Sequence, residues 1–192
     1  RHATDGSLTI AQDSPSGTNT MLFKTADAHQ WTLDASGNWL PAATDHGIYL
    51  GVTSATASNL LDDYEEGTWT VGLRGGTTAG DHTYHGRNGY YTKVGRAVHI
   101  IGGVHLNAKG TLDGNVFVTG LPFTVGAAGA AMTISYAGGM NITADTTPVG
   151  YADNNTTEFV IRHWDASGGT SNLDDSEFPG GTQIVFSGTY FI

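Results

Sequence analysis

The chain has no cysteine, only five prolines among its 192 residues, and no apolar run of the roughly 18 residues that a membrane-spanning helix needs. The absence of cysteine excludes disulfide bonds and thiolate metal sites. No signal peptide is visible, although an N-terminal segment missing from this sequence would hide one. The chain begins at Arg1 rather than at a methionine, as expected for a piece of a longer protein. These absences predict a protein that does not insert into membranes.

Basic residues are also scarce. Eight Lys and Arg face 18 Asp and Glu, which gives a formal charge of −10 at pH 7. A nucleic-acid-binding protein needs a basic face to neutralise phosphates, so the charge argues against that class of partner. The excess of carboxylates favours solubility and discourages nonspecific association with other acidic surfaces.

Glycine is abundant, with 28 residues, while no stretch offers the Ala, Leu, Glu and Lys content of a long helix. Short alternating runs separated by Gly, Asn and Asp turns predict an all-β chain. The first part, residues 1–58, has short strands and few large apolar groups, typical of a stalk or a β-prism-like module. Residues 71–192 carry longer alternations and predict a β-sandwich or jelly-roll head.

The head is expected to contain at least seven strands, at residues 68–74, 89–94, 97–106, 115–118, 131–136, 158–164 and 183–192. The third is the clearest, because Val98, Ile100 and Val104 fall on one face. Gly102 and Gly103 within it indicate a bulge or a close approach of another backbone. Three long loops are expected between the strands, at residues 75–88, 143–157 and 165–181, and loops of that length are often functional.

Residues 59–70 form an acidic segment between the two modules, and we interpret it as a hinge that also serves assembly. Leu60, Leu61 and Trp69 are expected to be buried against a neighbour, since exposing a large aliphatic side chain forfeits about 1.5–3 kcal/mol. The carboxylates of Asp62 and Asp63 have two interpretations. They either lie in a solvated turn or bind a cation or the basic side chains of another subunit.

Catalytic motifs are absent: no nucleophile elbow, phosphate-binding loop, dinucleotide fingerprint or zinc-protease helix occurs. Asp81, His82 and His85 have side chains that bind divalent metals, most effectively if three chains bring them to one axis. A chance pair of histidines in a polar loop is the simpler interpretation, and no cofactor is otherwise expected. Carboxylates are plentiful, but sequence cannot pair them for hydrolysis, and we expect a protein that is not an enzyme.

Sugar binding needs an aromatic face beside hydrogen-bonding groups, and such residues gather in the expected loops. The candidate receptor residues are Tyr84, His85, Tyr151, Asp153, Asn154, Trp164 and Asp165. The alternative is that the large aromatic residues belong to the core or to a subunit interface, where such side chains usually lie.

The segment Leu-Leu-Asp-Asp-Tyr-Glu-Glu-Gly-Thr-Trp-Thr at 60–70, followed by Gly-Tyr-Tyr-Thr-Lys-Val-Gly at 89–95, resembles a signature of bacteriophage tail fibre and tail-tip proteins. The resemblance covers residues 47–124, with a looser match at Ser187–Tyr190. Where such proteins usually continue with proline, this chain has Val71. In that family the motif introduces the C-terminal head domain, so the chain resembles the distal part of a receptor-binding protein.

The resemblance implies an intertwined homotrimer in the virion tail, assembled in the host cytoplasm beside other phage tail proteins. It implies attachment to a bacterial surface glycan or protein. Two other classes stay open: a tailspike-like depolymerase that cleaves surface polysaccharide, and a purely structural component of the fibre.

Overall fold

A computed structural model describes residues 21–165 and 168–192, so the first twenty residues of the expected N-terminal module lie outside the described part. The chain divides into two compact units between Asp62 and Asp63, within the acidic segment. Helical structure in the described residues is limited to two 3-10 turns, η1 (Ala57–Asn59) and η2 (Asp175–Glu177). No helix in this part of the chain is long and apolar enough to cross a membrane.

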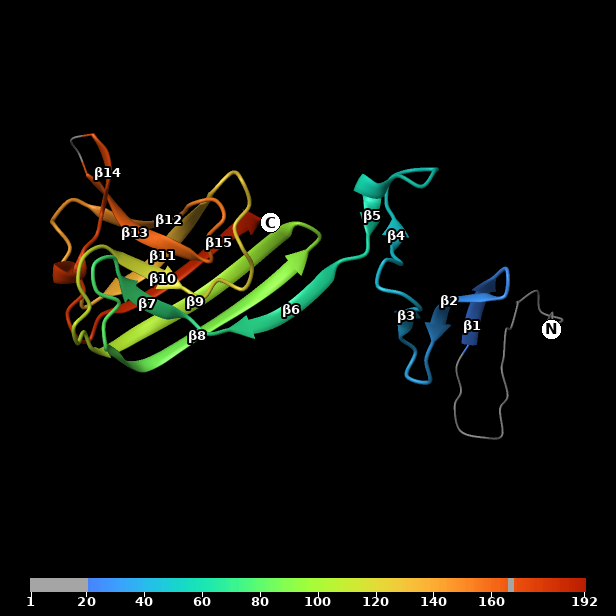
Figure 1. Cartoon of the computed structure of the whole chain (residues 1–192), viewed down its shortest axis with the longest axis horizontal. Coiled ribbons are helices and arrows are strands. Elements are labelled where there is room, and N and C mark those ends of the chain that lie inside the picture. Colours follow the sequence, from blue (N-terminus) through green and yellow to red (C-terminus); the bar gives the residue numbers. More distant parts are fainter. Residues whose placement is uncertain (1–20, 166–167) are drawn as a thin grey trace, which may run out of the picture. The chain divides into compact units, whose positions relative to one another are not determined.

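The N-terminal unit is built from short antiparallel strands (Figure 1). Strands β1 (Met21–Thr25), β2 (Ala28–Leu33) and β3 (Trp39–Pro41) form a three-stranded meander, and β4 (Ile48–Tyr49) pairs with β5 (Leu60–Leu61). The carboxylate of Asp34 closes the β2–β3 turn by accepting hydrogen bonds from the backbone N–H groups of Ser36 and Asn38, both at 2.8 Å. Gly37 has a φ of +86° in that turn, a conformation that favours glycine.

This unit has almost no interior. None of its described residues, 21–62, is buried, and its large apolar side chains face outward. Trp39 is 57% exposed and Ile48 is 58% exposed, while Phe23 stacks on Trp39 with ring centroids 4.7 Å apart. Two small sheets with this much exposed apolar surface are poorly stabilised by their own contacts.

The C-terminal unit is one ten-stranded antiparallel sheet with the path β6-β8-β9-β15-β11-β12-β13-β10-β7, while β14 pairs with β13 beside that path. Its strands are β6 (Tyr64–Trp69), β7 (Gly72–Gly75), β8 (Thr83–Val94), β9 (Ala97–Ala108), β10 (Val116–Thr119), β11 (Ala130–Gly138), β12 (Thr147–Ala152), β13 (Glu158–Asp165), β14 (Gly169–Asn172) and β15 (Gln183–Phe191).

The sheet curls on itself, so that its two halves face each other across one core (Figure 1). The two ends of the path, β6 and β7, are consecutive in sequence and only two residues separate them. Phe186 of β15 lies 5.0 Å from Phe159 of β13 and 6.0 Å from Trp69 of β6, measured between ring centroids. The prediction of an all-β chain with a sandwich-like head is therefore confirmed.

Trp69 anchors this core and is 8% exposed. Its indole lies against Gly89 of β8, where an added Cβ would overlap the ring. Gly102 of β9 also lies in this core, because a Cβ there would lie 2.7 Å from Phe186 and 3.2 Å from Trp69. The groups that approach Gly102 are thus aromatic side chains and not the expected backbone, and the pairing of β8 with β9 runs through it without a bulge.

The expected strand and loop boundaries are wrong in four places. The single strand expected at 68–74 is two strands, because the chain crosses from one end of the sheet to the other between β6 and β7. The loop expected at 75–88 contains the start of β8, which pairs with β9 along nearly its whole length. The loop expected at 143–157 contains β12, which pairs with β11 and β13, and the loop expected at 165–181 contains β14, which pairs with β13.

The acidic segment makes its contacts within the same chain. Lys93 of β8, whose side chain is 7% exposed, forms an ion pair with Asp63, and the hydroxyl of Tyr91 donates to Glu65. Asp63 thus has a basic partner within its own chain, and binding of a basic side chain from another subunit stays a prediction. Leu61 remains 39% exposed, in contrast to Trp69.

Replacing Trp69 with Ala is expected to destabilise the C-terminal unit by about 3–5 kcal/mol, because it leaves a cavity beside two glycines that cannot fill it. Chemical denaturation followed by circular dichroism measures the loss. Trp164→Ala is the matched control: Trp164 is 57% exposed, and its removal is expected to change stability by less than about 0.5 kcal/mol. Equal effects of the two variants would contradict the anchoring role of Trp69.

Candidate functional site: a groove across β11 to β14

A groove of about 610 Å³ crosses the outer face of the sheet at β11, β12, β13 and β14. Its outward-facing lining includes Thr133, Val149, Tyr151, Arg162, Trp164 and Thr170. The volume falls within the roughly 300–1,000 Å³ that is usual for small-molecule and cofactor sites. The groove is therefore large enough to receive a ligand.

Strand alternation explains why these side chains share one face. Val149 of β12 pairs with Arg162 of β13, and Thr147 pairs with Trp164. Ile161, which directly precedes Arg162 on β13, is fully buried and faces the core. Successive residues of a strand point to opposite faces, so a buried Ile161 places Arg162 outside, and Trp164 lies on the same side two residues later.

Two aromatic side chains stand exposed at the groove. Trp164 is 57% exposed and Tyr151 is 44% exposed. An aromatic ring offers a flat apolar surface, and the Tyr hydroxyl and Trp N–H add hydrogen-bonding groups at its edge. Aromatic rings exposed together in a hollow are suited to binding a ligand that has both an apolar face and a polar rim.

Arg162 is held in place by β14. Its Nε donates to the Thr170 hydroxyl at 2.8 Å, Nη1 donates to the Asn172 side-chain oxygen at 2.7 Å, and Nη2 donates to the Thr170 carbonyl at 2.8 Å. All three partners are neutral. They fix the plane of the guanidinium without neutralising its charge.

A second hollow of about 220 Å³ adjoins the groove and shares Tyr151 and Arg162 with it. Two carboxylates, Asp153 and Glu158, line this hollow. Glu158 forms a bidentate ion pair with Arg74, which raises the pKa of that guanidinium. The hollow thus places two carboxylates beside the aromatic groove.

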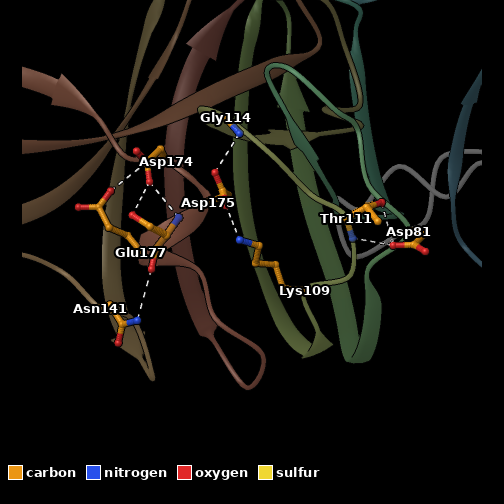
Figure 2. A network of polar contacts seen from close by, with 9 residues as sticks. Asp81, Lys109, Thr111, Gly114, Asn141, Asp174, Asp175 and Glu177 are labelled. Carbon is orange, nitrogen blue, oxygen red and sulfur yellow. Dashed lines mark hydrogen bonds and ion pairs between the residues drawn. The ribbon is translucent and has the colours of Figure 1, made fainter.

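Other carboxylates hold the loops between the strands (Figure 2). Asp174 caps η2 by accepting from the Ser176 N–H at 2.9 Å, and Glu177 accepts from the Asp174 N–H at 2.9 Å. Asp175 forms an ion pair with Lys109 and accepts from the Gly114 N–H at 3.0 Å. The Lys109 ammonium and this hydrogen bond lower the pKa of Asp175. These acidic side chains have structural partners and do not point into the groove.

The three candidate metal ligands have separate contacts. Asp81 accepts from the N–H and hydroxyl of Thr111, and the first of these bonds contributes most to a lowered pKa of Asp81 (Figure 2). His82 lies 2.6 Å from the Tyr84 hydroxyl, and burial lowers the pKa of His82. His85 packs against His105, with ring centroids 4.8 Å apart. Within residues 21–165 and 168–192, no group of three or more His, Asp or Glu side chains could hold a metal ion.

The candidate receptor residues fall into two groups. Tyr151 and Trp164 line the groove, Asp153 lines the adjoining hollow, and Asn154 follows it in an exposed turn. Asp165, the last residue of β13, pairs with Gly169 of β14.

Tyr84 and His85 lie elsewhere, on β8. The Tyr84 hydroxyl accepts from the Leu73 N–H at 2.8 Å, and its ring lies under the Arg87 guanidinium at 4.6 Å. The hydrogen bond with Leu73 means that Tyr84 connects β8 to β7. His85 lines a different hollow, together with Arg87, Asn88 and His105.

Sequence reasoning missed Arg162, Val149 and Thr170. The spacing of Arg162 and Trp164 carried a usable signal, because residues two apart in a strand share a face. No pattern in the sequence identified Thr170, because it lies at the groove only through the pairing of β14 with β13.

No family model and no curated protein sequence matches the chain. Among solved structures, the crystal structure of the Dettilon tailspike protein, gp208, is similar, with a TM-score of 0.59 and 14% sequence identity. The similarity covers 67% of this chain, close to the share that lies in the C-terminal unit, and 24% of the tailspike chain. At this identity the comparison shows a shared fold: the fold of this chain also occurs in a phage tailspike.

The comparison also corrects one expectation. The sequence predicts a protein that is not an enzyme. The similar structure, however, is a tailspike, and a tailspike-like depolymerase is the enzymatic alternative named above. The absence of catalytic sequence motifs is therefore no ground for excluding hydrolysis, since carboxylates that converge only in the fold leave no local motif.

Proposed function

We propose that the chain is part of a phage tail protein and that the groove across β11 to β14 binds a glycan of the bacterial surface. The observation that carries this proposal is the exposed Trp164 beside the fixed guanidinium of Arg162 in one groove. The tailspike fold and the resemblance of the acidic segment to tail fibre proteins support the same class.

The groove has the chemistry that sugar binding needs. A pyranose ring offers one apolar face, which packs on Trp164 or Tyr151, and its hydroxyls hydrogen-bond with Thr133 and Thr147 at the rim. Arg162 supplies donors in a fixed direction, so little side-chain entropy is lost when a ligand binds.

Trp164→Ala is expected to lower the affinity for a surface polysaccharide by roughly thirty-fold, about 2 kcal/mol, because it removes the exposed apolar platform. Binding of the purified chain to a panel of bacterial cells and their polysaccharides measures the effect. Tyr90→Ala is the matched control, since Tyr90 is 53% exposed on β8 and lies outside the groove. Full binding by the Trp164 variant would show that the receptor site lies elsewhere on the chain, whereas absence of binding by the wild-type chain would favour a purely structural role.

Hydrolysis of the bound polysaccharide is the second candidate function. The tailspike similarity favours it, and so does the hollow that places Asp153 and Glu158 beside the groove. A glycoside hydrolase uses two carboxylates that flank the bond to be cleaved. A glycan lying on Trp164 and Tyr151 would extend toward this pair.

Release of reducing ends from a bound polysaccharide tests hydrolysis. Asp153→Asn is expected to abolish release while leaving binding intact, because the exposed Asp153 carries little of the fold. Asp145→Asn, in an exposed turn outside both hollows, is the control. If the wild-type chain binds a polysaccharide without shortening it, attachment alone remains.

The exposed apolar surface of the N-terminal unit supports a further part of the proposal, the assembly of several copies. Leu22, Trp39, Leu40, Ile48 and Leu50 are between 45% and 58% exposed there. Intertwining with copies of the same chain would bury them, and the resemblance to tail fibres implies three copies in the virion tail, beside other tail proteins.

Sedimentation at micromolar concentration is expected to show a trimer that persists in mild denaturant, because each copy covers apolar surface of the others. Trp39→Ser combined with Ile48→Ser is expected to shift the chain toward monomer while the spectrum of the C-terminal unit is kept. A folded wild-type monomer at that concentration would contradict the assembly.

A further inference from the structure

We propose that the glycan bound in the groove is acidic, and that one carboxylate or phosphate group of each binding unit forms a bidentate ion pair with Arg162. This inference rests on the proposed function and adds the chemical class of the ligand. It follows from where charge lies on the C-terminal unit.

The charge of the groove is opposite to that of the chain. The protein carries a formal charge of −10. Among the described residues, the lining of the groove nevertheless contains one basic residue, Arg162, and no aspartate or glutamate. Asp153 and Glu158 line the adjoining hollow, which Arg162 also lines. An anion would therefore bind on the side of Arg162 that faces Trp164.

Arg162 also differs from the other half-buried cations of this unit. Arg74 is paired with Glu158, Lys93 with Asp63 and Lys109 with Asp175. None of the ion pairs between described residues involves Arg162. The groups that accept its hydrogen bonds, on Thr170 and Asn172, are neutral, an arrangement that favours an anion on the side of the groove.

The geometry leaves donors for that anion. A guanidinium has five N–H groups in a planar fork, and protein atoms accept three of them at Arg162. One N–H of Nη1 and one of Nη2 remain for a carboxylate or phosphate, and such charge-assisted bonds are roughly twice as strong as neutral ones. A sugar hydroxyl bound at the same place would gain only the weaker bond.

The net negative charge of the chain repels an acidic glycan only weakly at the distances that separate most of its carboxylates from the groove. Charges separated by more than about 8 Å are largely screened at physiological salt, whereas a contact ion pair is screened much less. The affinity is therefore expected to fall when salt is raised, since one ion pair contributes, but binding through the aromatic platform is expected to persist.

An array that pairs each acidic polysaccharide with its carboxyl-reduced neutral form tests the inference on the wild-type chain. The acidic member of a bound pair, carrying uronic acid or sialic acid groups, is expected to bind about ten-fold or more tightly than its reduced form. Phosphate-bearing polymers with their dephosphorylated forms provide the second arm.

Variants locate the anion. Arg162→Gln is expected to remove the preference for the acidic form, and Arg162→Lys is expected to keep part of it, because Lys retains charge without the fork. Arg87→Gln is the matched control, since Arg87 also has no carboxylate partner among the described ion pairs but lines a different hollow. Melting curves show which variants are folded, and the paired polymers test the inference even if Arg162→Gln unfolds.

The outcomes separate the two proposals. Equal binding of acidic and reduced forms, abolished by Trp164→Ala, would overturn the acidic ligand and leave glycan binding in the groove. An acidic preference that Arg162→Gln leaves unchanged would overturn the role of Arg162. Absence of binding to every polymer and to host cells would overturn the proposed function itself, and this inference with it.

Discussion

The packing of Trp69 onto Gly89, Gly102 and Phe186 is the constraint on which the C-terminal unit depends. Trp69 is the last residue of β6, two residues before the chain crosses to β7 at the other end of the sheet. The indole of Trp69 packs against β8, β9 and β15 and thereby fixes where the sheet curls. Phe186 of β15 also packs against Phe159 of β13 on the facing half of the sheet. Once Phe159 and Ile161 face this core, the alternation of β13 sends Arg162 and Trp164 to the outer face.

Much of the architecture could be predicted from the sequence, because the strongest alternations belong to strands that are buried on one face. Val98, Ile100 and Val104 identify β9, and the apolar run before Ile192 identifies β15. Strands β12 and β14 could not be found in this way. Their residues include Thr, Gly, Pro, Ser and Asn, which are typical of loops, and they become strands through pairing with neighbouring strands, β12 with β11 and β13 and β14 with β13. Tertiary pairing overrides local propensity there.

The candidate site was predicted in part, for a related reason. Tyr151 and Trp164 were named as candidate glycan-binding residues, with burial in the core or an interface as the alternative, and the register of β12 against β13 brings them to one groove. Tyr84 has the same local composition around it but braces Leu73 from β8. Nearby polar residues in the sequence could not tell Tyr151 from Tyr84. The two differ in the strand that each contacts: Tyr151 lies beside β13, and Tyr84 contacts β7. Arg162 was missed because a basic residue in a strand gives no sign of whether a carboxylate neutralises it.

The two units divide two physical tasks. The C-terminal unit buries its own core and can hold a rigid groove, but a shallow groove with one aromatic platform and one guanidinium binds a repeating glycan only weakly. The N-terminal unit leaves its apolar side chains exposed, and under the proposed assembly it would gain stability from copies of itself. Association there would multiply the groove, and several weak sites on one particle can raise the overall affinity by roughly 10² to 10⁴. If both proposals hold, the exposed apolar surface of the N-terminal unit would drive the association that supplies avidity to the groove of the C-terminal unit.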